Sequence, residues 1–528
     1  MQKNTPSINN SRQKTVNLTI IFVFMIIIVR LFYWQIIMGP TIRANNISQN
    51  SKLQNILPNT GKILSSDNFP LSLGVKAYKL SIYKPNLKIS LNDLFNQIEK
   101  TKPNTTINNS LQINNLNNPN IKWVTLTGTF NQNQKQQLTI PGIEFEESNF
   151  RYYPEGNLAK NIVINLESFY KRALNGKMGY SLSSIDGTGQ TILTNRNWRQ
   201  SEIDGQDIKT SLNRHIQIIL TDTLTRGLEL YQAKSVSGTI IDPSTGLIIA
   251  MYSIQSDTTP NTNINNISNL FEPGSIFKPL IIAMALDNKT IDTDFVCSDC
   301  NQPRVFGQYT INNWDNTFHS NSTLKDIIKN SDNIGMSNII QKLGLTNFQK
   351  YFHLLKLDSK NDIDLIGESV SPSKKFFADI DLATASFGQG LAVNELQMIQ
   401  AFNTLANHGQ FVSGHFNKEM PTTPINIFSD ETTKKVTDIL KYAVENGAIK
   451  SLKPKDLEVC AKSGTAQISI GGQYNDSNTI GSYIGFSPCI SPKFTMIITI
   501  SQPQKGEWGS STAAPLWYEI ATKLSPLL

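Results

Sequence analysis

The sequence predicts an α+β protein made of a transmembrane helix, an extended α+β module and a C-terminal domain with an antiparallel sheet and a helical subdomain. A long apolar run lies near the N-terminus, and short strand-like runs follow it between residues 40 and 205. Beyond residue 205, strand-like runs at both ends enclose a helical middle, which is typical of an α+β domain. A chain of 528 residues also exceeds the usual size of one domain.

The first element is a predicted membrane anchor. Residues 1–15 carry three basic side chains and no acid, and residues 16–38 form a run of 23 residues with Arg30 as its only charge. Such a run can span a bilayer core of about 30 Å. The basic flank places residues 1–15 in the cytoplasm as a short tail. No cleavage site follows, so we expect residues 16–38 to be an uncleaved signal-anchor in the cytoplasmic membrane, with a single pass and everything beyond it outside.

The second element is a predicted non-catalytic α+β module at residues 40–205. This region is rich in Asn, Gln, Ser and Thr and contains strand-like runs such as residues 77–83 and 123–127. The Asn-crowded stretch 102–119 is predicted to be a loop.

The third element, residues 206–528, is predicted to hold the reaction centre. Apolar spacing predicts a helix over 212–231, and two β-like runs predict a hairpin over 236–252. The region 275–445 is mainly helical by the same criteria. The remaining predicted elements are strands at 458–467, 480–486 and 494–500 and a helix at 513–524. We expect the strands from both ends of the domain to form one antiparallel sheet.

Composition narrows the function classes. With 39% hydrophobic and 17% charged residues the chain is an ordinary globular protein, and its net charge of +7 favours an anionic envelope or membrane surface. No basic run is interleaved with aromatic residues, so we expect no nucleic-acid partner. Cys297 and Cys300 have C-x-x-C spacing but no second pair nearby, so we expect no metal site. They would form a local disulfide or stay as two free thiols.

The first chemical motif is S-x-x-K, with Ser275 and Lys278. Pro273 and Gly274 break the preceding chain, and an apolar helical run follows. If a helix begins near Ser275, the two side chains share one face, so the Lys278 amine can activate the Ser275 hydroxyl as a nucleophile. By itself this motif is common.

The second and third motifs are Ser331-Asp332-Asn333 and the strand-like Lys462-Ser463-Gly464-Thr465. Ser331 could relay a proton, and Asn333 could hydrogen-bond a substrate amide. Lys462 could attract a terminal carboxylate that Ser463 and Thr465 also bind, while Gly464 would let a substrate backbone approach. The backbone N–H groups of Ser275 and Thr465 would form an oxyanion hole.

The three motifs occur in one fixed order behind a membrane anchor, and this combination is typical of active-site-serine acyltransferases. The chain resembles the class B penicillin-binding proteins, the monofunctional peptidoglycan D,D-transpeptidases of septal or elongation type. The matching segments lie at 151–154, 166–170, 271–279, 387–391, 396–397, 406–409, 485–488 and 514–515.

The resemblance implies a pedestal domain of the dimerisation type at 40–205 and a transpeptidase domain of the penicillin-binding/β-lactamase-like fold at 206–528. Ser275 would be acylated by stem peptides ending in D-Ala-D-Ala, releasing D-Ala before a neighbouring amine attacks. β-Lactams would acylate the same serine, and no cofactor would be needed. A SEDS-type glycan polymerase and other membrane proteins of division or elongation would be partners. Residues 59–67 lack the arginines usual in this family, which puts partner contacts of the pedestal in doubt.

Three rivals use related features. A class A β-lactamase would carry E-x-x-L-N after the second motif, where this chain offers only residues 367–371. A non-catalytic scaffold of the division machinery would lack a motif residue, and none is missing. A D,D-carboxypeptidase would use the same residues with water as acceptor.

Overall fold

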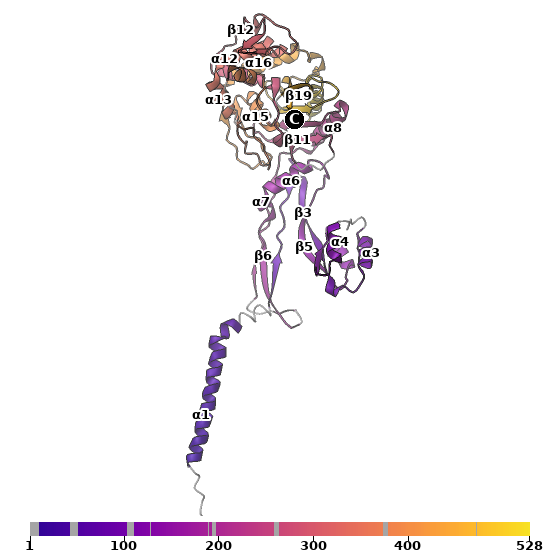
Figure 1. Ribbon diagram of the computed structural model, residues 1–528, viewed down its shortest axis with the longest axis vertical. Helices are drawn as coiled ribbons and strands as arrows, with labels where there is room; N and C mark the ends of the chain where they lie inside the picture. The colour runs from indigo at the N-terminus through magenta and orange to yellow at the C-terminus, as the bar shows by residue number, and fades with distance from the viewer. Residues whose placement is uncertain are drawn as a thin grey trace, which may run out of the picture. The chain divides into compact units, whose positions relative to one another are not determined.

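The computed structural model describes residues 10–42, 51–102, 110–126, 128–187, 190–192, 197–257, 263–372, 378–470 and 473–528 (Figure 1). The chain forms two compact units, each built from separate segments. The first unit comprises Met1–Thr60, Ala77–Asn149 and Asn175–Gly205, and the second comprises Gly61–Lys76, Phe150–Leu174 and Gln206–Leu528. Beyond the tail and the anchor, the sequence predicts a single border between the module at 40–205 and the domain at 206–528. The structure instead assigns 61–76 and 150–174 to the unit with the predicted reaction centre.

The N-terminal apolar run is a helix. α1 spans Asn10–Phe32 and continues as a π-helical turn, η1, over Tyr33–Ile37. The candidate span Ser11–Ile37 contains an 18-residue window with a mean hydropathy of 2.4, and none of that window is buried. Within the described ranges it is the one helix long and apolar enough to cross a membrane, and its position agrees with the predicted anchor.

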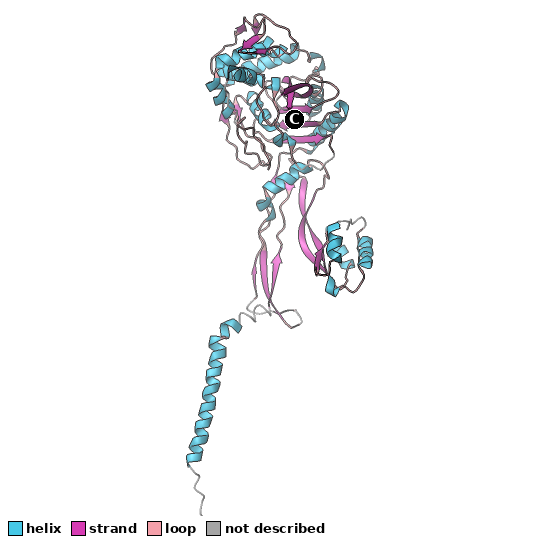
Figure 2. Cartoon of the chain, viewed as in Figure 1, coloured by secondary structure: helices cyan, strands magenta, loops and turns pink. Residues whose placement is uncertain are grey.

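The rest of the first unit has an antiparallel sheet and a small α+β core (Figure 2). In the sheet, β6 pairs with β1, β7 and β8. In the core, Leu80 and Ile82 pack against Leu94 and Ile98 of α3 and Val124 of β4. The elements are β1 (Ser51–Ile56), α3 (Leu91–Thr101), α4 (Ser110–Asn117), β4 (Trp123–Thr125), α5 (Gln132–Gln137), β6 (Gly179–Ile185), β7 (Thr191–Ile192) and β8 (Trp198–Gln200), with β3 (Pro70–Tyr83) and β5 (Ile143–Tyr152) passing between the units.

The prediction of a loop over residues 102–119 is wrong for the second half of that stretch. α4 occupies Ser110–Asn117, while residues 103–109 lie outside the described part. Leu116 of this helix is buried in the core beside Val124. Burial of an apolar side chain outweighs the weak helix propensity of the neighbouring asparagines.

The second unit is built on one five-stranded antiparallel sheet in the order β11-β10-β20-β19-β18. The two ends of the unit meet where β10 (Ser235–Ile241) pairs with β20 (Phe494–Ser501). The other strands are β11 (Ile248–Gln255), β18 (Cys460–Ile470) and β19 (Gln473–Ser487). The predicted sheet assembled from both ends of the domain is therefore confirmed.

Helices cover both faces of this sheet. α8 (Arg214–Tyr231) and α17 (Ala513–Leu524) pack on one face, where Leu220 and Trp517 contact Ile498 in a shared core. The next residue of β20, Ile497, belongs to the core of the opposite face, as alternation along a strand requires. That second core contains the helical subdomain.

The helical subdomain carries most of the remaining elements of the second unit. They are α9 (Asn265–Ser268), η3 (Gly274–Phe277), α10 (Lys278–Asp287), α11 (Leu324–Asn330), α12 (Asn333–Leu343), α13 (Leu345–Leu354), α14 (Asp379–Ala385), α15 (Glu395–Ala406), α16 (Asp430–Asn446) and the short strands β12 (Val296–Cys297), β13 (Arg304–Phe306), β14 (Tyr309–Ile311), β15 (Ser322–Thr323), β16 (Gln410–Phe411) and β17 (Ile425–Asn426). Outside it lie β2 (Ile63–Leu64), α6 (Lys160–Phe169), α7 (Lys171–Asn175), which ends at the border of the units, β9 (Ile208–Lys209) and the 3-10 turn η4 (Lys450–Leu452).

All four cysteines are paired in disulfides. Cys297 is bonded to Cys300, which decides between the two states left open by the sequence. Cys460, at the start of β18, is bonded to Cys489, 29 residues later and just beyond β19. Both bridges are buried.

Removing the second bridge should destabilise the protein measurably. We expect the Cys460→Ser/Cys489→Ser variant to lose about 3–4 kcal/mol in free energy of unfolding, because the bridge closes a loop of 29 residues. The Cys297→Ser/Cys300→Ser variant is the matched control and should lose less, since its bridge spans only three residues. Urea unfolding of the three proteins would measure both effects. Equal midpoints for the two double variants would contradict the loop-closure argument.

Candidate functional site

The three sequence motifs meet around one hydroxyl group in the second unit. The Oγ of Ser331 donates to Ser275 Oγ at 2.9 Å. The same oxygen lies 3.0 Å from Lys278 Nζ and 3.2 Å from Lys462 Nζ. A nucleophile candidate and two amines from separate parts of the chain thus share one small polar side chain.

Ser275 lies on a 3-10 turn that the local sequence enforces. η3 spans Gly274–Phe277 and leads directly into α10, so the helix that was expected to begin near Ser275 begins as a 3-10 turn. Residues i and i+3 eclipse in this geometry, which keeps Ser275 and Lys278 on one side. Gly274 has φ +57°, and a Cβ there would stand 3.0 Å from Thr465 O, so this turn packs tightly against β18.

Ser331 is held by an unusual backbone conformation. It caps the C-terminus of α11 with φ 55°, in the left-handed region. The next residue, Asp332, caps the N-terminus of α12 by accepting hydrogen bonds from Ile334 and Gly335 N–H groups at 2.8 and 2.9 Å. Two helix ends therefore fix the turn, and such strain in a non-glycine residue is typical of a functional site.

Lys278 is fully buried and has three polar contacts. Its Nζ lies 2.6 Å from Ser331 O, 3.0 Å from Ser331 Oγ and 2.8 Å from Asn333 Oδ1. Burial lowers the pKa of Lys278 well below its usual value, and the nearby Lys462 lowers it further, whereas Asp332 raises it. A neutral amine has two N–H donors for the two carbonyl oxygens, and its lone pair can accept the Ser331 hydroxyl proton once that proton turns from Ser275 toward Lys278.

The expected contact between Lys278 and Ser275 is indirect. The amine touches Ser331, and Ser331 touches Ser275, so the hydroxyl of Ser331 lies between the two residues of the first motif. Neither the helical period nor the motif spacing reveals this intermediate position, because Ser331 comes from a different helix pair.

Lys462 points toward the same hydroxyl. Its Nζ donates to Ser463 O at 2.8 Å and lies 3.2 Å from Ser331 Oγ, which places it inside the cluster rather than at the outer side of β18. Burial lowers the pKa of Lys462 to about 7. The cluster therefore brings two amines with lowered pKa values together around one serine pair.

Acylation of Ser275 should depend on pH with a midpoint set by this cluster. We expect the second-order rate constant for labelling by penicillin to fall as the pH is lowered, because protonation of Lys278, whose pKa burial lowers, would fill the lone pair that is proposed to accept the serine proton. A stopped-flow or quenched labelling series from pH 5 to 9 measures it. The free energy of unfolding should rise as the pH increases from about 7 to the pKa of lysine in the unfolded chain, because the unfolded chain binds more protons than the folded chain over this interval. A rate independent of pH across this range would contradict an uncharged amine as base.

The other residues of the third motif lie on the outer strand of the sheet. Ser463 and Thr465 are half-buried on β18, and Thr465 Oγ1 accepts from Gly509 N at 3.0 Å. A Cβ on Gly464 would stand 2.9 Å from Ile276 Cγ2 and 3.2 Å from Pro273 O. Gly464 was expected to admit a substrate backbone, and the structure adds a packing reason, since a side chain would push β18 from the Ser275 turn.

Asn333 is engaged within the protein. Its Oδ1 faces Lys278, and its Nδ2 donates to Asn312 O at 3.1 Å. Its backbone N–H donates to Asn313 Oδ1 at 2.8 Å. The side chain expected to bind a substrate amide thus also positions the Lys278 amine.

The sequence alone assigns no role to several residues of this region. Asp332 and Asn313 hold the second motif, and two exposed tryptophans, Trp314 and Trp508, contact each other with ring centroids 5.0 Å apart. Trp314 donates to Asn330 O, next to Ser331. Their positions follow from loops whose conformation no periodic pattern predicts.

The described residues include no group of three or more His, Cys, Asp or Glu side chains arranged to hold a metal ion. The groups that the structure brings together at the Ser275 cluster are hydroxyl groups and amines.

Comparison with known proteins places this arrangement in context. Residues 236–522 match the penicillin binding protein transpeptidase domain. The chain is 26% identical over 540 residues to the peptidoglycan D,D-transpeptidase FtsI of Buchnera aphidicola subsp. Schizaphis graminum, covering 95% of this chain and 92% of that protein. It is 26% identical over 408 residues to the probable peptidoglycan D,D-transpeptidase PenA of Neisseria meningitidis serogroup A, covering 72% and 69%. Among solved structures, penicillin binding protein 2X of Streptococcus thermophilus has a TM-score of 0.70 at 20% identity, covering 90% and 81%, which shows a shared fold.

Proposed function

Because the chain belongs to the penicillin-binding protein transpeptidase domain family, we propose that it is a serine-type peptidoglycan D,D-transpeptidase that cross-links stem peptides. One observation carries the residue assignment, namely the hydrogen-bond path from Lys278 Nζ through Ser331 Oγ to Ser275 Oγ. This path connects a buried amine of lowered pKa to a half-buried hydroxyl.

Acylation begins at Ser275. Its Oγ attacks the carbonyl carbon of the D-Ala-D-Ala amide, and its proton passes through Ser331 Oγ to the neutral Lys278 amine. The backbone N–H groups of Ser275 and Thr465 stabilise the oxyanion, a role supported by the close packing of the Ser275 turn on β18. The C–N bond then breaks, and the departing D-Ala nitrogen takes the proton back through the same path.

Transfer to the acceptor reverses these proton movements. The amine of a second stem peptide attacks the ester carbon, gives up a proton to the Lys278–Ser331 path and displaces Ser275 Oγ, which is reprotonated. Lys462, Ser463 and Thr465 provide positive charge and hydroxyl groups for the terminal carboxylate of the donor peptide. The Oδ1 atom of Asn333 positions the Lys278 amine, and the remaining hydrogen-bonding capacity of the Asn333 side chain binds the substrate amide.

The alternative that the protein is a class A β-lactamase requires a glutamate that activates the deacylating water, and the structure gives no support for one. Glu368, in the segment that a deacylating glutamate would occupy, accepts two hydrogen bonds from the buried Asn361, at 3.0 Å from the backbone N–H and 3.0 Å from Nδ2. This carboxylate is used to hold a loop.

We place α1 across the cytoplasmic membrane with residues 1–15 inside and the second unit outside, on the basis of the basic flank. Partners are a SEDS-type glycan polymerase and other membrane proteins of the division or elongation machinery, as the family resemblance implies. β-Lactams react as analogues of D-Ala-D-Ala.

Labelling with a fluorescent penicillin tests the function directly. The full chain in detergent micelles is incubated with the label, run on a denaturing gel and digested, and the adduct is located by mass spectrometry. We expect one stable adduct on Ser275 and, with synthetic stem peptides, cross-linked dimers. An adduct elsewhere would overturn the assignment of Ser275. Rapid hydrolysis of the penicillin without label would favour a β-lactamase, and tetrapeptide without dimers would favour a carboxypeptidase.

A further inference from the structure

A polar pocket of about 330 Å³ lies in the second unit beside β11. β11 and β18 are the two outer strands of the five-stranded sheet, so this pocket and the Ser275 cluster lie along opposite edges. The established motifs and the proposed mechanism use none of its lining residues.

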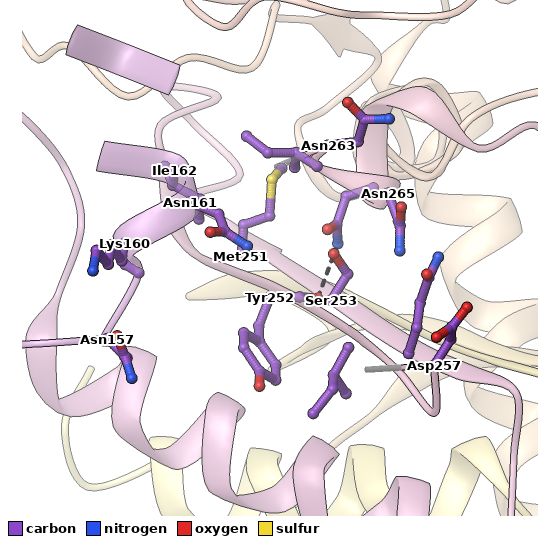
Figure 3. Close-up of a pocket in the computed structure, with 15 residues that line it drawn as sticks. Asn157, Lys160, Asn161, Ile162, Met251, Tyr252, Ser253, Asp257, Asn263 and Asn265 are labelled. Carbon is purple, nitrogen blue, oxygen red and sulfur yellow. Dashed lines mark hydrogen bonds between the residues drawn. The ribbon is translucent and has the colours of Figure 1, made fainter. Parts of the chain in front are cut away.

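Carboxamides dominate the walls. The six amide side chains of the lining are Asn157, Asn161, Gln255, Asn263, Asn265 and Asn266. Figure 3 shows that they come from two sides, with Asn157 and Asn161 on one wall, Asn263 and Asn265 on the other, and Ser253 between them. Each amide offers both a donor and an acceptor, which suits a ligand with many hydroxyl or amide groups.

The charge of the lining is balanced. Lys160 and Asp257 contribute one positive and one negative side chain, and the other lining residues are uncharged. The Lys160 ammonium lies 5.4 Å from the ring centroid of Tyr153, so an aromatic face already engages it. The pocket therefore favours a neutral ligand over a phosphate or an ammonium ion.

Asn266 supplies an unused acceptor at this pocket. Its side chain is 1% exposed, and its Nδ2 donates to Glu395 Oε1 at 2.7 Å and lies within 3.2 Å of Tyr252 O. Its Oδ1 has no hydrogen-bond partner among the described residues. A buried acceptor without a partner is unfavourable, so this wall of the pocket carries a polar group that the protein alone leaves unsatisfied.

The edge of β11 adds backbone groups. Gln217 of α8 covers the outer edge at Met251, donating to its carbonyl at 2.8 Å and accepting from its N–H at 3.1 Å. Ser253 and Gln255 follow Met251 at steps of two, so their backbone N–H and C=O groups face the same outer edge. These groups line the pocket together with the amide side chains.

We propose that this pocket is a subsite for a neutral N-acetylhexosamine ring, such as a sugar of a glycan strand. The acetamido group and the hydroxyls pair with the carboxamides that line the two walls of the pocket. The class of ligand, a neutral sugar, is inferred from the lining of the pocket. Only the idea that this sugar belongs to a peptidoglycan strand rests on the proposed function.

Titration with chitotriose, the trimer of N-acetylglucosamine, tests the subsite. Saturation-transfer NMR and calorimetry on the full chain in micelles should show binding, with maltotriose, which lacks acetamido groups, at least tenfold weaker. Ser253→Phe fills the pocket from β11 and should weaken chitotriose binding at least tenfold, and Asn161→Ala, an exposed position of α6, about threefold. Asn446→Ala, an exposed asparagine of α16 outside the lining, is the matched control and should bind as the wild type does.

Absence of chitotriose binding, equal binding of maltotriose, or wild-type affinity in both pocket variants would overturn the proposal. Purified glycan strands without stem peptides test whether the natural ligand is a glycan polymer or a free sugar. If it is a polymer, the affinity of the strands, calculated per sugar unit, should be at least that of chitotriose. Penicillin labelling of Ser275 is a separate readout that both pocket variants should retain. Loss of labelling in the wild type would contradict the proposed function and leave the sugar result standing by itself.

Discussion

Replacing Ser275 by alanine should abolish the covalent penicillin adduct and lower cross-linking by at least about 10⁴-fold, because no other hydroxyl is placed to accept the acyl group. Ser331 Oγ is the nearest alternative, 2.9 Å from Ser275 Oγ. It is fixed by the left-handed turn at φ 55° and contacts two amines. The measurement is gel fluorescence after saturating label, with adduct mapping by mass spectrometry.

Two further variants make the result specific. Ser525→Ala changes an exposed serine near the C-terminus and should label as the wild type does. Ser275→Cys keeps a nucleophile at the same turn and should retain a slow adduct on residue 275. If Ser275→Ala carried an adduct on Ser331, the order of the two hydroxyls in the proton path would have to be reversed.

Replacing Lys278 by methionine should lower the acylation rate constant by about 10²–10⁴-fold without unfolding the protein. Methionine matches the length of the lysine stem but removes the amine that takes the serine proton through Ser331. Because Lys278 is completely buried and its charged form is disfavoured there, relief of the burial penalty should offset part of the loss of its hydrogen bonds, so we expect the free energy of unfolding to fall by no more than about 1–3 kcal/mol. Quenched labelling with penicillin and urea unfolding measure the two quantities.

The stability readout separates a chemical role from a structural one. A variant that loses acylation together with more stability than this would show that Lys278 acts mainly by holding Ser331 and Asn333 in place. Lys342→Met, on the exposed side of α12, is the matched control and should change neither quantity. Rapid acylation by Lys278→Met would contradict Lys278 as the base and transfer that role to Lys462, whose amine lies 3.2 Å from the same hydroxyl.

The sequence predicted most of the architecture that positions the site. Strand-like runs at 236–252 and 494–500 predicted β10, β11 and β20, and apolar spacing over 212–231 predicted α8. The helix expected at 513–524 is α17. These signals are strong because each element buries one face and exposes another, or is buried within a sheet. Motif order then indicated which loops would meet.

The geometry inside the site was less accessible. That Ser331 stands between Lys278 and Ser275 depends on a left-handed residue between two helices, and a tripeptide in the sequence does not reveal its φ angle. Glu395 is another example, since it is buried and receives hydrogen bonds from Ser237, Thr239, Asn266 and Thr499. These partners come from three distant segments, so only the tertiary structure explains a buried carboxyl, whose pKa burial raises.

The assignment of 61–76 and 150–174 to the second unit also had no local signal. Arg151 donates to Gly61 O, and Lys62 N donates to Asp207 Oδ1 at 2.7 Å, contacts between segments far apart in the chain. A change in amino-acid composition along the chain suggests a domain border, but a compact unit is defined by contacts between segments that are far apart in the sequence.

The pairing of β10 with β20 governs when the enzyme can exist during its biosynthesis. Ser275 is followed by 253 residues, and the sheet beneath it lacks three of its five strands until Ser501 has been synthesised. Until then β10 has an open edge, and the lysine of β18 is absent from the cluster. Synthesis therefore delivers the proposed nucleophile first and its polar environment last. A nascent or truncated chain then carries Ser275 without the Lys462 amine, and with an exposed strand that quality-control proteases and chaperones can recognise.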